Sequence, residues 1–165
     1  MSTPRGQVLR DDDGMRLEFI RTYDAPIEDV WSAMTEPERI ARWIGEVTGD
    51  PTTGIVQFLM SEDVDGDPSE VTIVACEPPH LLDIDIPTPD GSWPLSIRLA
   101  PHESGTTLIF THRLAEPFDA TSIGPGWHFY LDRLGSTIAG DSPDQVWDDY
   151  YPSLHDAYPL PGPQR

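Results

Sequence analysis

His112 has the clearest capacity for chemistry, because it ends a run of alternating apolar side chains. In the segment Thr106–Leu114, successive strand residues point to opposite sides, so Leu108, Phe110 and His112 share one face. If the two apolar residues point inward, the imidazole does too, and it could hydrogen-bond a ligand or carry a proton. The structural alternative is a histidine at a strand end, bonded to the backbone of a loop.

His128 and Asp132 form a second polar pair, four residues apart in a predicted helix. Residues at this spacing can meet on one helix face, where the carboxylate would orient the imidazole. The apolar stripe of the same helix runs through Trp127, Leu131 and Leu134. We therefore expect the His128–Asp132 pair on the solvated side.

Metal and cofactor chemistry find no support in the sequence. The segment Asp63–Asp67 resembles the start of a calcium loop, but Pro68 stands where the turn glycine belongs and Val74 replaces the final glutamate. The five His and one Cys have no zinc-binding spacing, and no nucleotide-binding or nucleophile motif occurs in a suitable context. We expect no metal, no cofactor and no assigned catalytic residue. The single cysteine, Cys76, excludes an internal disulfide and is predicted to be a small core residue.

Charge narrows the class of partner. The 165 residues suit one domain, and their formal net charge of −19 disfavours nucleic acid and anionic membrane surfaces. All cations are Arg, and Lys and Asn are both absent, which fits a GC-rich genome better than salt adaptation. No leader sequence and no apolar run of about 20 residues is present, so we expect a cytoplasmic protein without membrane insertion.

Hydrophobic periodicity predicts the elements that would position these residues. A strand is expected over Met15–Tyr23, followed by a helix over Ile27–Thr35 with Asp24 as a candidate cap. A second short helix opens at Glu36-Pro37, and its inner face carries Ile40, Trp43 and Ile44. The chain then turns β-like, with close spacing that favours an antiparallel meander. The predicted meander strands are Ile55–Met60, Glu70–Cys76, Leu81–Ile86, Leu95–Ala100 and Thr106–Leu114.

The long helical pattern over Gly126–Ala139 is the element that this sheet must hold. Gly124-Pro125-Gly126 supplies a break before it, and Gly140 is a plausible stop after it. We therefore divide the chain into a polar N-terminal segment (1–14), an α+β domain (15–140) and an acidic, aromatic and proline-rich tail (141–165).

Several sequence motifs make the prediction of an α+β domain more specific. The segment from Tyr23 to Trp43, with its Ala-Pro, Val-Trp, Pro-Glu-Arg and Trp elements, closely resembles the start of the heat-shock-protein-90 ATPase activator homologue-like family. Glu77-Pro78-Pro79, the strand from Gly105 to His112 and Gly126-Trp127 are similar to it as well, so the resemblance covers roughly Gly6 to Ala139. This family belongs to the START-like, Bet v 1-related (SRPBCC) superfamily. The resemblance implies a helix-grip fold: a curved antiparallel sheet wrapped around a long C-terminal helix, with two short helices after the first strand.

The resemblance leaves function open, because this superfamily includes lipid carriers, polyketide cyclases, steroid binders and co-chaperone domains. Our leading hypothesis is a non-catalytic domain that binds a small hydrophobic molecule (lipid, isoprenoid or polyketide-like) between sheet and helix. The candidate cavity residues are Trp31, Trp43, Phe58, Met60, Phe110, His112, Trp127, Tyr130, Leu131 and Leu134. For Trp31 and Trp43, core packing is the alternative.

Two alternative functions remain. One is a cyclase or aromatase that uses His112 as general acid and base. The other is a protein-interaction or co-chaperone-type module, for which the tail offers Trp147, Tyr150, Tyr151 and Tyr158. We expect the tail to pack on its own domain, and the protein to be a monomer or homodimer.

Overall fold

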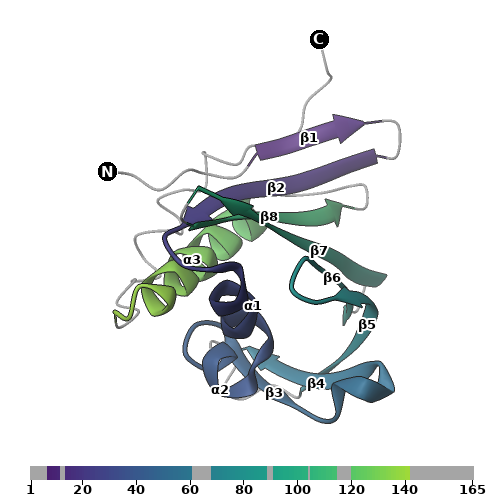
Figure 1. Cartoon of the computed structure of the whole chain (residues 1–165). Helices are drawn as coiled ribbons and strands as arrows, with labels where there is room; N and C mark the ends of the chain where they lie inside the picture. Colours follow the sequence, from purple (N-terminus) through teal and green to yellow (C-terminus); the bar gives the residue numbers. More distant parts are fainter. Residues whose placement is uncertain are drawn as a thin grey trace.

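An antiparallel sheet that curves around a long helix forms the frame of the molecule (Figure 1). The computed structural model describes residues 7–11, 14–60, 68–88, 91–103, 105–114 and 120–141. Within these ranges, eight strands pair in the order β1-β2-β8-β7-β6-β5-β4-β3. The strands are β1 (Gln7–Asp11), β2 (Gly14–Tyr23), β3 (Gly45–Thr48), β4 (Ile55–Met60), β5 (Ser69–Glu77), β6 (Leu81–Thr88), β7 (Gly91–His102) and β8 (Gly105–Leu114). The helices are α1 (Ile27–Thr35), α2 (Pro37–Ile40) and α3 (Ala120–Ile138), with a 3-10 turn, η1, at Pro51–Thr53.

The helix-grip fold predicted from the sequence is confirmed. Helix α3 lies against β2 and α1, while α1 also contacts β7 and β8. None of the helices in these residues is long and apolar enough to cross a membrane.

Strands β2 and β8 place alternating side chains against α3. Their register pairs Leu17 with His112 and Phe19 with Phe110, whose rings meet edge to face at 6.2 Å between centroids. All four side chains are buried, as the alternation predicts. The prediction that His112 points inward is therefore correct.

Helix α1 has the predicted bounds, but its cap differs from our expectation. The N-cap is Pro26, which makes no side-chain cap bond, and its carbonyl accepts from the amides of Asp29 and Val30. Asp24 lies two residues too early in the chain to cap this helix. Beyond α2, Trp43 donates its indole N–H to the carbonyl of Ala33 over 2.8 Å, so the turn is fastened to α1.

Helix α3 begins at Ala120, six residues before the predicted start. Gly124-Pro125-Gly126 was expected to break the chain, yet it lies within the helix, where Pro125 costs one backbone hydrogen bond. The predicted stop is correct. Gly140 has φ +85°. Its amide donates to the carbonyl of Thr137, and the amide of Asp141 donates to the carbonyl of Ser136. This pair of bonds is a Schellman motif.

Two edge strands were missed by the sequence analysis. Strand β1 lies in the segment expected to be a polar N-terminal extension, and it pairs with β2 through partners such as Leu9 and Arg16. Strand β3 pairs with β4 at the other edge. Edge strands bond on one side only, so they need less apolar alternation than central strands. The Asp63–Asp67 segment and the tail from residue 142 lie outside the described residues.

Candidate functional site

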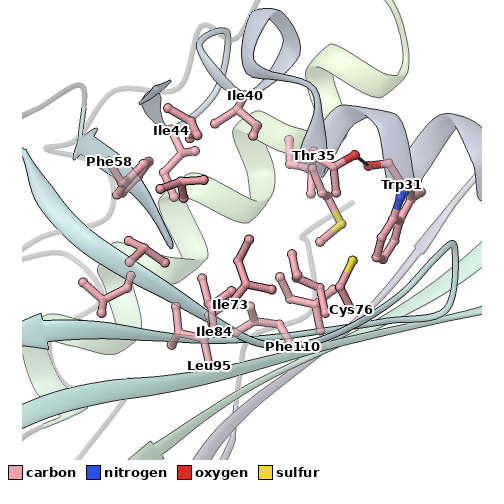
Figure 2. Close-up of a pocket in the computed structure, with 18 of the residues that line it drawn as sticks. Trp31, Thr35, Ile40, Ile44, Phe58, Ile73, Cys76, Ile84, Leu95 and Phe110 are labelled. Atoms are coloured by element: carbon pink, nitrogen blue, oxygen red, sulfur yellow. Dashed lines mark hydrogen bonds between the residues drawn. The ribbon is translucent and has the colours of Figure 1, made fainter. Parts of the chain in front are cut away.

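A cavity of about 250 Å³ lies between the sheet and the three helices. Helix α1 contributes Trp31, Met34 and Thr35 to its wall, and α3 contributes Trp127 and Leu134. Side chains from both sides converge on the open space in Figure 2. No charged side chain lines this cavity in the part of the chain that the structure describes.

The floor of the cavity comes from the alternation of strands β5 to β7. On β6, Leu82, Ile84 and Ile86 line the cavity, whereas Asp83 and Asp85 between them do not. Ile73 on the neighbouring strand pairs directly with Ile84. Because side chains in a strand alternate between faces, this pattern forms a continuous apolar floor. The sequence analysis named no residue of β5 to β7 as a candidate, although the same alternation could have identified them.

Beside the end of β5 the cavity reaches the surface, at a mouth formed by Trp31, Thr35, Cys76 and Pro78. Cys76 and Pro78 line it and are also exposed to solvent, while Trp31 and Thr35 are half-buried. Figure 2 shows Trp31, Thr35 and Cys76 at one end of the cavity. Cys76 is therefore not the buried core residue that we expected. A register shift between Ile73 and Ala75 interrupts the alternation just before it, and the strand ends one residue later.

Most polar groups of the wall are already bonded within the protein. The hydroxyl of Thr35 donates to the carbonyl of Trp31 over 2.8 Å, and the indole of Trp43 is bonded as described above. The indole N–H of Trp127 donates to Nδ1 of His112 over 3.1 Å. These three donors are thus unavailable to an occupant of the cavity.

His112 is buried behind this wall and does not line the cavity. Its ring packs against Trp93 at 5.1 Å and against Trp127 at 6.3 Å between centroids. Burial disfavours the charged imidazolium and lowers the pKa of His112 to about 4, so the ring is neutral at pH 7. Since Nδ1 accepts the indole proton, the neutral ring carries its own proton on Nε2. An indole, rather than a loop backbone, occupies Nδ1.

The ten candidate residues fall into three groups. Lining the cavity are Trp31, Trp43, Phe58, Phe110, Trp127, Leu131 and Leu134. His112 and Tyr130 are buried but do not line it, and Tyr130 packs on Phe129 with ring centroids 5.1 Å apart. The side chain of Met60 lies outside the described residues.

A buried polar cluster occupies the opposite flank of α3, where it faces β2. Arg21 Nη1 bonds to Asp132 Oδ1 at 2.6 Å, and His128 Nε2 lies 3.6 Å from Asp132 Oδ2. His128 is only 5% exposed, so the expectation of a solvated pair was wrong. A helix held in the curve of a sheet has two covered flanks, whereas the apolar stripe marks only one of them. Desolvation by burial also raises the pKa of the neighbouring Tyr23.

Among the described residues, no three His, Cys, Asp or Glu side chains are grouped so as to hold a metal ion. The charges of the Arg21–Asp132 pair compensate each other inside the core. The cavity and this cluster lie on different flanks of α3, so the cluster contributes no charge to the cavity wall.

Solved structures with the same architecture include three of note. CalU16 from Micromonospora echinospora is 28% identical, with a TM-score of 0.75 and 96% of each chain covered. DynU16, from the dynemicin biosynthetic locus, is 22% identical at a TM-score of 0.69, over 78% of this chain and 49% of its own. EF2215 from Enterococcus faecalis is 18% identical at 0.71, over 93% and 87%.

Comparison with curated proteins gives no match. The family model described as "Activator of Hsp90 ATPase homolog 1-like protein" matches residues 24–139. That match includes both short helices, the meander and all of α3. The chain therefore belongs to the Activator of Hsp90 ATPase homolog 1-like family.

Proposed function

We propose that this protein is a non-catalytic binding domain for a small hydrophobic molecule, which it holds between the sheet and α3. The observation that carries this proposal is the cavity of about 250 Å³, whose described wall is mostly apolar and carries no charged side chain. Burial of apolar ligand surface contributes roughly 25 cal/mol per Å², so such a wall can bind without specific polar contacts. One structural relative, DynU16, comes from a biosynthetic locus, which agrees with a small molecule as the occupant.

The geometry gives less support to a cyclase. A general acid and base must reach the reacting atoms, but His112 is behind Trp127 and does not line the cavity. No carboxylate of the described residues lines it either, so the imidazole has no titratable partner facing the ligand. The protein-interaction alternative depends on the tail and stays a prediction.

Two neighbouring residues of β5 allow a matched test. Ile73 lines the cavity, whereas Val74 is 59% exposed and does not. We expect the neutral apolar dye Nile red to bind the wild-type protein and Val74→Trp with similar affinity. Ile73→Trp narrows the cavity and should weaken dye binding at least tenfold. Circular dichroism would check that both variants are folded, and a folded Ile73→Trp that binds normally would contradict the proposal.

The single thiol gives an independent readout. Cys76 lines the mouth and is the one cysteine of the chain. Saturating Nile red should slow its alkylation by N-ethylmaleimide in the folded protein and have no effect in denaturant. Native mass spectrometry of gently purified protein would show whether a lipid-sized molecule already occupies the cavity.

A further inference from the structure

The cavity wall limits the charge that an occupant can carry. None of the described lining residues is charged. The side chains of Thr35, Trp43 and Trp127 already donate hydrogen bonds to acceptors within the protein. A buried carboxylate or ammonium loses its hydration, and only ion pairs or several strong hydrogen bonds can replace it. The described wall offers neither, so it cannot stabilise a charged group.

One strong side-chain donor of the wall has no acceptor among the described residues. The indole Nε1 of Trp31 has no hydrogen-bond partner in the described part of the chain, although the residue lines the cavity and is only half-buried. Figure 2 places Trp31 at the same end as Thr35 and Cys76. The oxygen of the Thr35 hydroxyl keeps acceptor capacity after donating to the carbonyl of Trp31. This end therefore presents one indole donor, a weak thiol donor and one hydroxyl acceptor.

That set of groups fits an uncharged oxygen. A carbonyl or ether oxygen needs one donor, and a ligand hydroxyl could also donate to Thr35. A carboxylate needs two or three strong donors to offset its desolvation, and the described residues of the mouth supply only one.

The surroundings of the mouth also oppose an anion. Glu36 follows Thr35 directly, and Glu77 lies between Cys76 and Pro78, and both glutamates are exposed. The whole chain carries a net charge of −19. Repulsion from exposed carboxylates is screened beyond about 8 Å at physiological salt, so the loss of hydration inside the cavity is the larger effect. The same loss applies to an ammonium group once it enters.

We infer that the cavity selects an uncharged molecule with an apolar body and a single hydrogen-bond-accepting oxygen, held at the mouth beside Trp31. The inference rests on the proposed binding function and adds the chemical class of the ligand. It excludes fatty acids and other amphiphiles whose charged group would enter the cavity.

A series of probes with one aromatic body tests this selectivity. We would measure displacement of Nile red by naphthalene, 2-acetylnaphthalene, 2-naphthoate and 2-(aminomethyl)naphthalene at pH 7.5. The acetyl compound and the carboxylate have nearly the same shape, so their difference reports charge. We expect 2-acetylnaphthalene to bind at least tenfold more tightly than either charged compound, and several-fold more tightly than naphthalene.

Trp31→Phe tests the donor itself. The affinity ratio of 2-acetylnaphthalene to naphthalene should fall about three- to tenfold, which is the usual range for one hydrogen bond. Nile red that fails to bind the wild-type protein would contradict the binding function. Nile red binding combined with equal affinity for the acetyl compound and either charged compound would overturn the inference alone. So would failure of 2-acetylnaphthalene to displace the dye, or an unchanged ratio in Trp31→Phe.

Discussion

Trp127 donates its indole proton to Nδ1 of His112 across 3.1 Å, and both side chains are buried. This bond joins α3 to β8 at the point where the helix covers the sheet. The indole ring of Trp127 also lines the cavity. His112 thus acts through Trp127: it fixes the ring that forms part of the wall.

Substitution of His112 should separate hydrogen bonding from packing. His112→Ala leaves the indole donor of Trp127 without its acceptor and opens a void beside Trp93, so we expect the free energy of unfolding to fall by about 2–4 kcal/mol. His112→Gln keeps an acceptor and should cost about 1 kcal/mol. Urea denaturation would measure both. Equal losses in the two variants would show that the hydrogen bond contributes little.

The lowered pKa of His112 predicts a loss of stability in acid. The pKa of this imidazole is about 4 in the folded protein, whereas the ordinary value of 6.5 applies to the unfolded chain, so between these values the unfolded chain binds more protons. Stability contributed by the neutral ring is therefore present above pH 6.5 and is lost as the pH falls towards 4. The difference between these two pKa values corresponds to about 3 kcal/mol of folding stability.

The matched variant isolates this contribution from the carboxylates, which titrate in both proteins. We would compare the free energies of unfolding of wild type and His112→Gln at pH 7.5 and 4.5. The wild type should lose about 2–3 kcal/mol more than the variant over this interval. Parallel losses would mean that the histidine titrates normally in the folded state.

The Arg21–Asp132 pair should be strongly coupled. Arg21 is buried and the Asp132 side chain is only 11% exposed, and Nε and Nη2 of Arg21 have no hydrogen-bond partner among the described residues. Asp132→Asn leaves an uncompensated buried guanidinium and should cost about 3 kcal/mol or more. Adding Arg21→Met removes that charge, so the double variant should recover about 2 kcal/mol relative to the sum of the single losses. A double-mutant cycle measured in urea tests this, and additive losses would contradict it.

Gly105 lies where the backbone of β8 approaches Tyr23. A Cβ atom on this residue would lie 2.2 Å from the Tyr23 carbonyl oxygen, a distance that the backbone must open to accommodate. We expect Gly105→Ala to lower stability by about 2 kcal/mol or more. The Cβ atom of Gly135→Ala would lie 3.2 Å from its nearest neighbour, the ring atom Cε1 of Tyr23. The cost of this close contact is offset by a gain in helix propensity of about 1 kcal/mol. Thermal melts should place this second variant close to wild type.

Local patterns in the sequence predicted the elements well where one face of an element meets the core. The bounds of α1 agree because Ala25-Pro26 precedes an apolar stripe, and the stop of α3 agrees because only Gly140 suits φ +85° at that point. The inward direction of His112 followed from alternation in the same way. These features depend on apolar residues that recur with a period of two or 3.6 residues, and such a period can be recognised directly in the sequence.

Features that depend on two distant segments were not predicted. His128 was placed in solvent because its own helix does not show that Phe19 on β2 packs against it. Cys76 was placed in the core because a register shift cannot be read from a run of apolar residues. The position of His112 behind the cavity wall likewise follows from how β8 and α3 meet, which no local pattern describes.

The order of the elements also sets when the cavity can form. Strands β2 and β8 are neighbours in the sheet, although the paired residues Met15 and Leu114 lie about a hundred positions apart. Closing so long a loop costs conformational entropy before the contacts between the paired strands can offset that cost. We therefore expect this pairing to be slow. Helix α3 follows β8 in the chain, and the apolar floor is therefore synthesised before its cover. A hydrophobic molecule that meets the chain at this stage can be enclosed during folding, without having to pass the mouth of the finished protein.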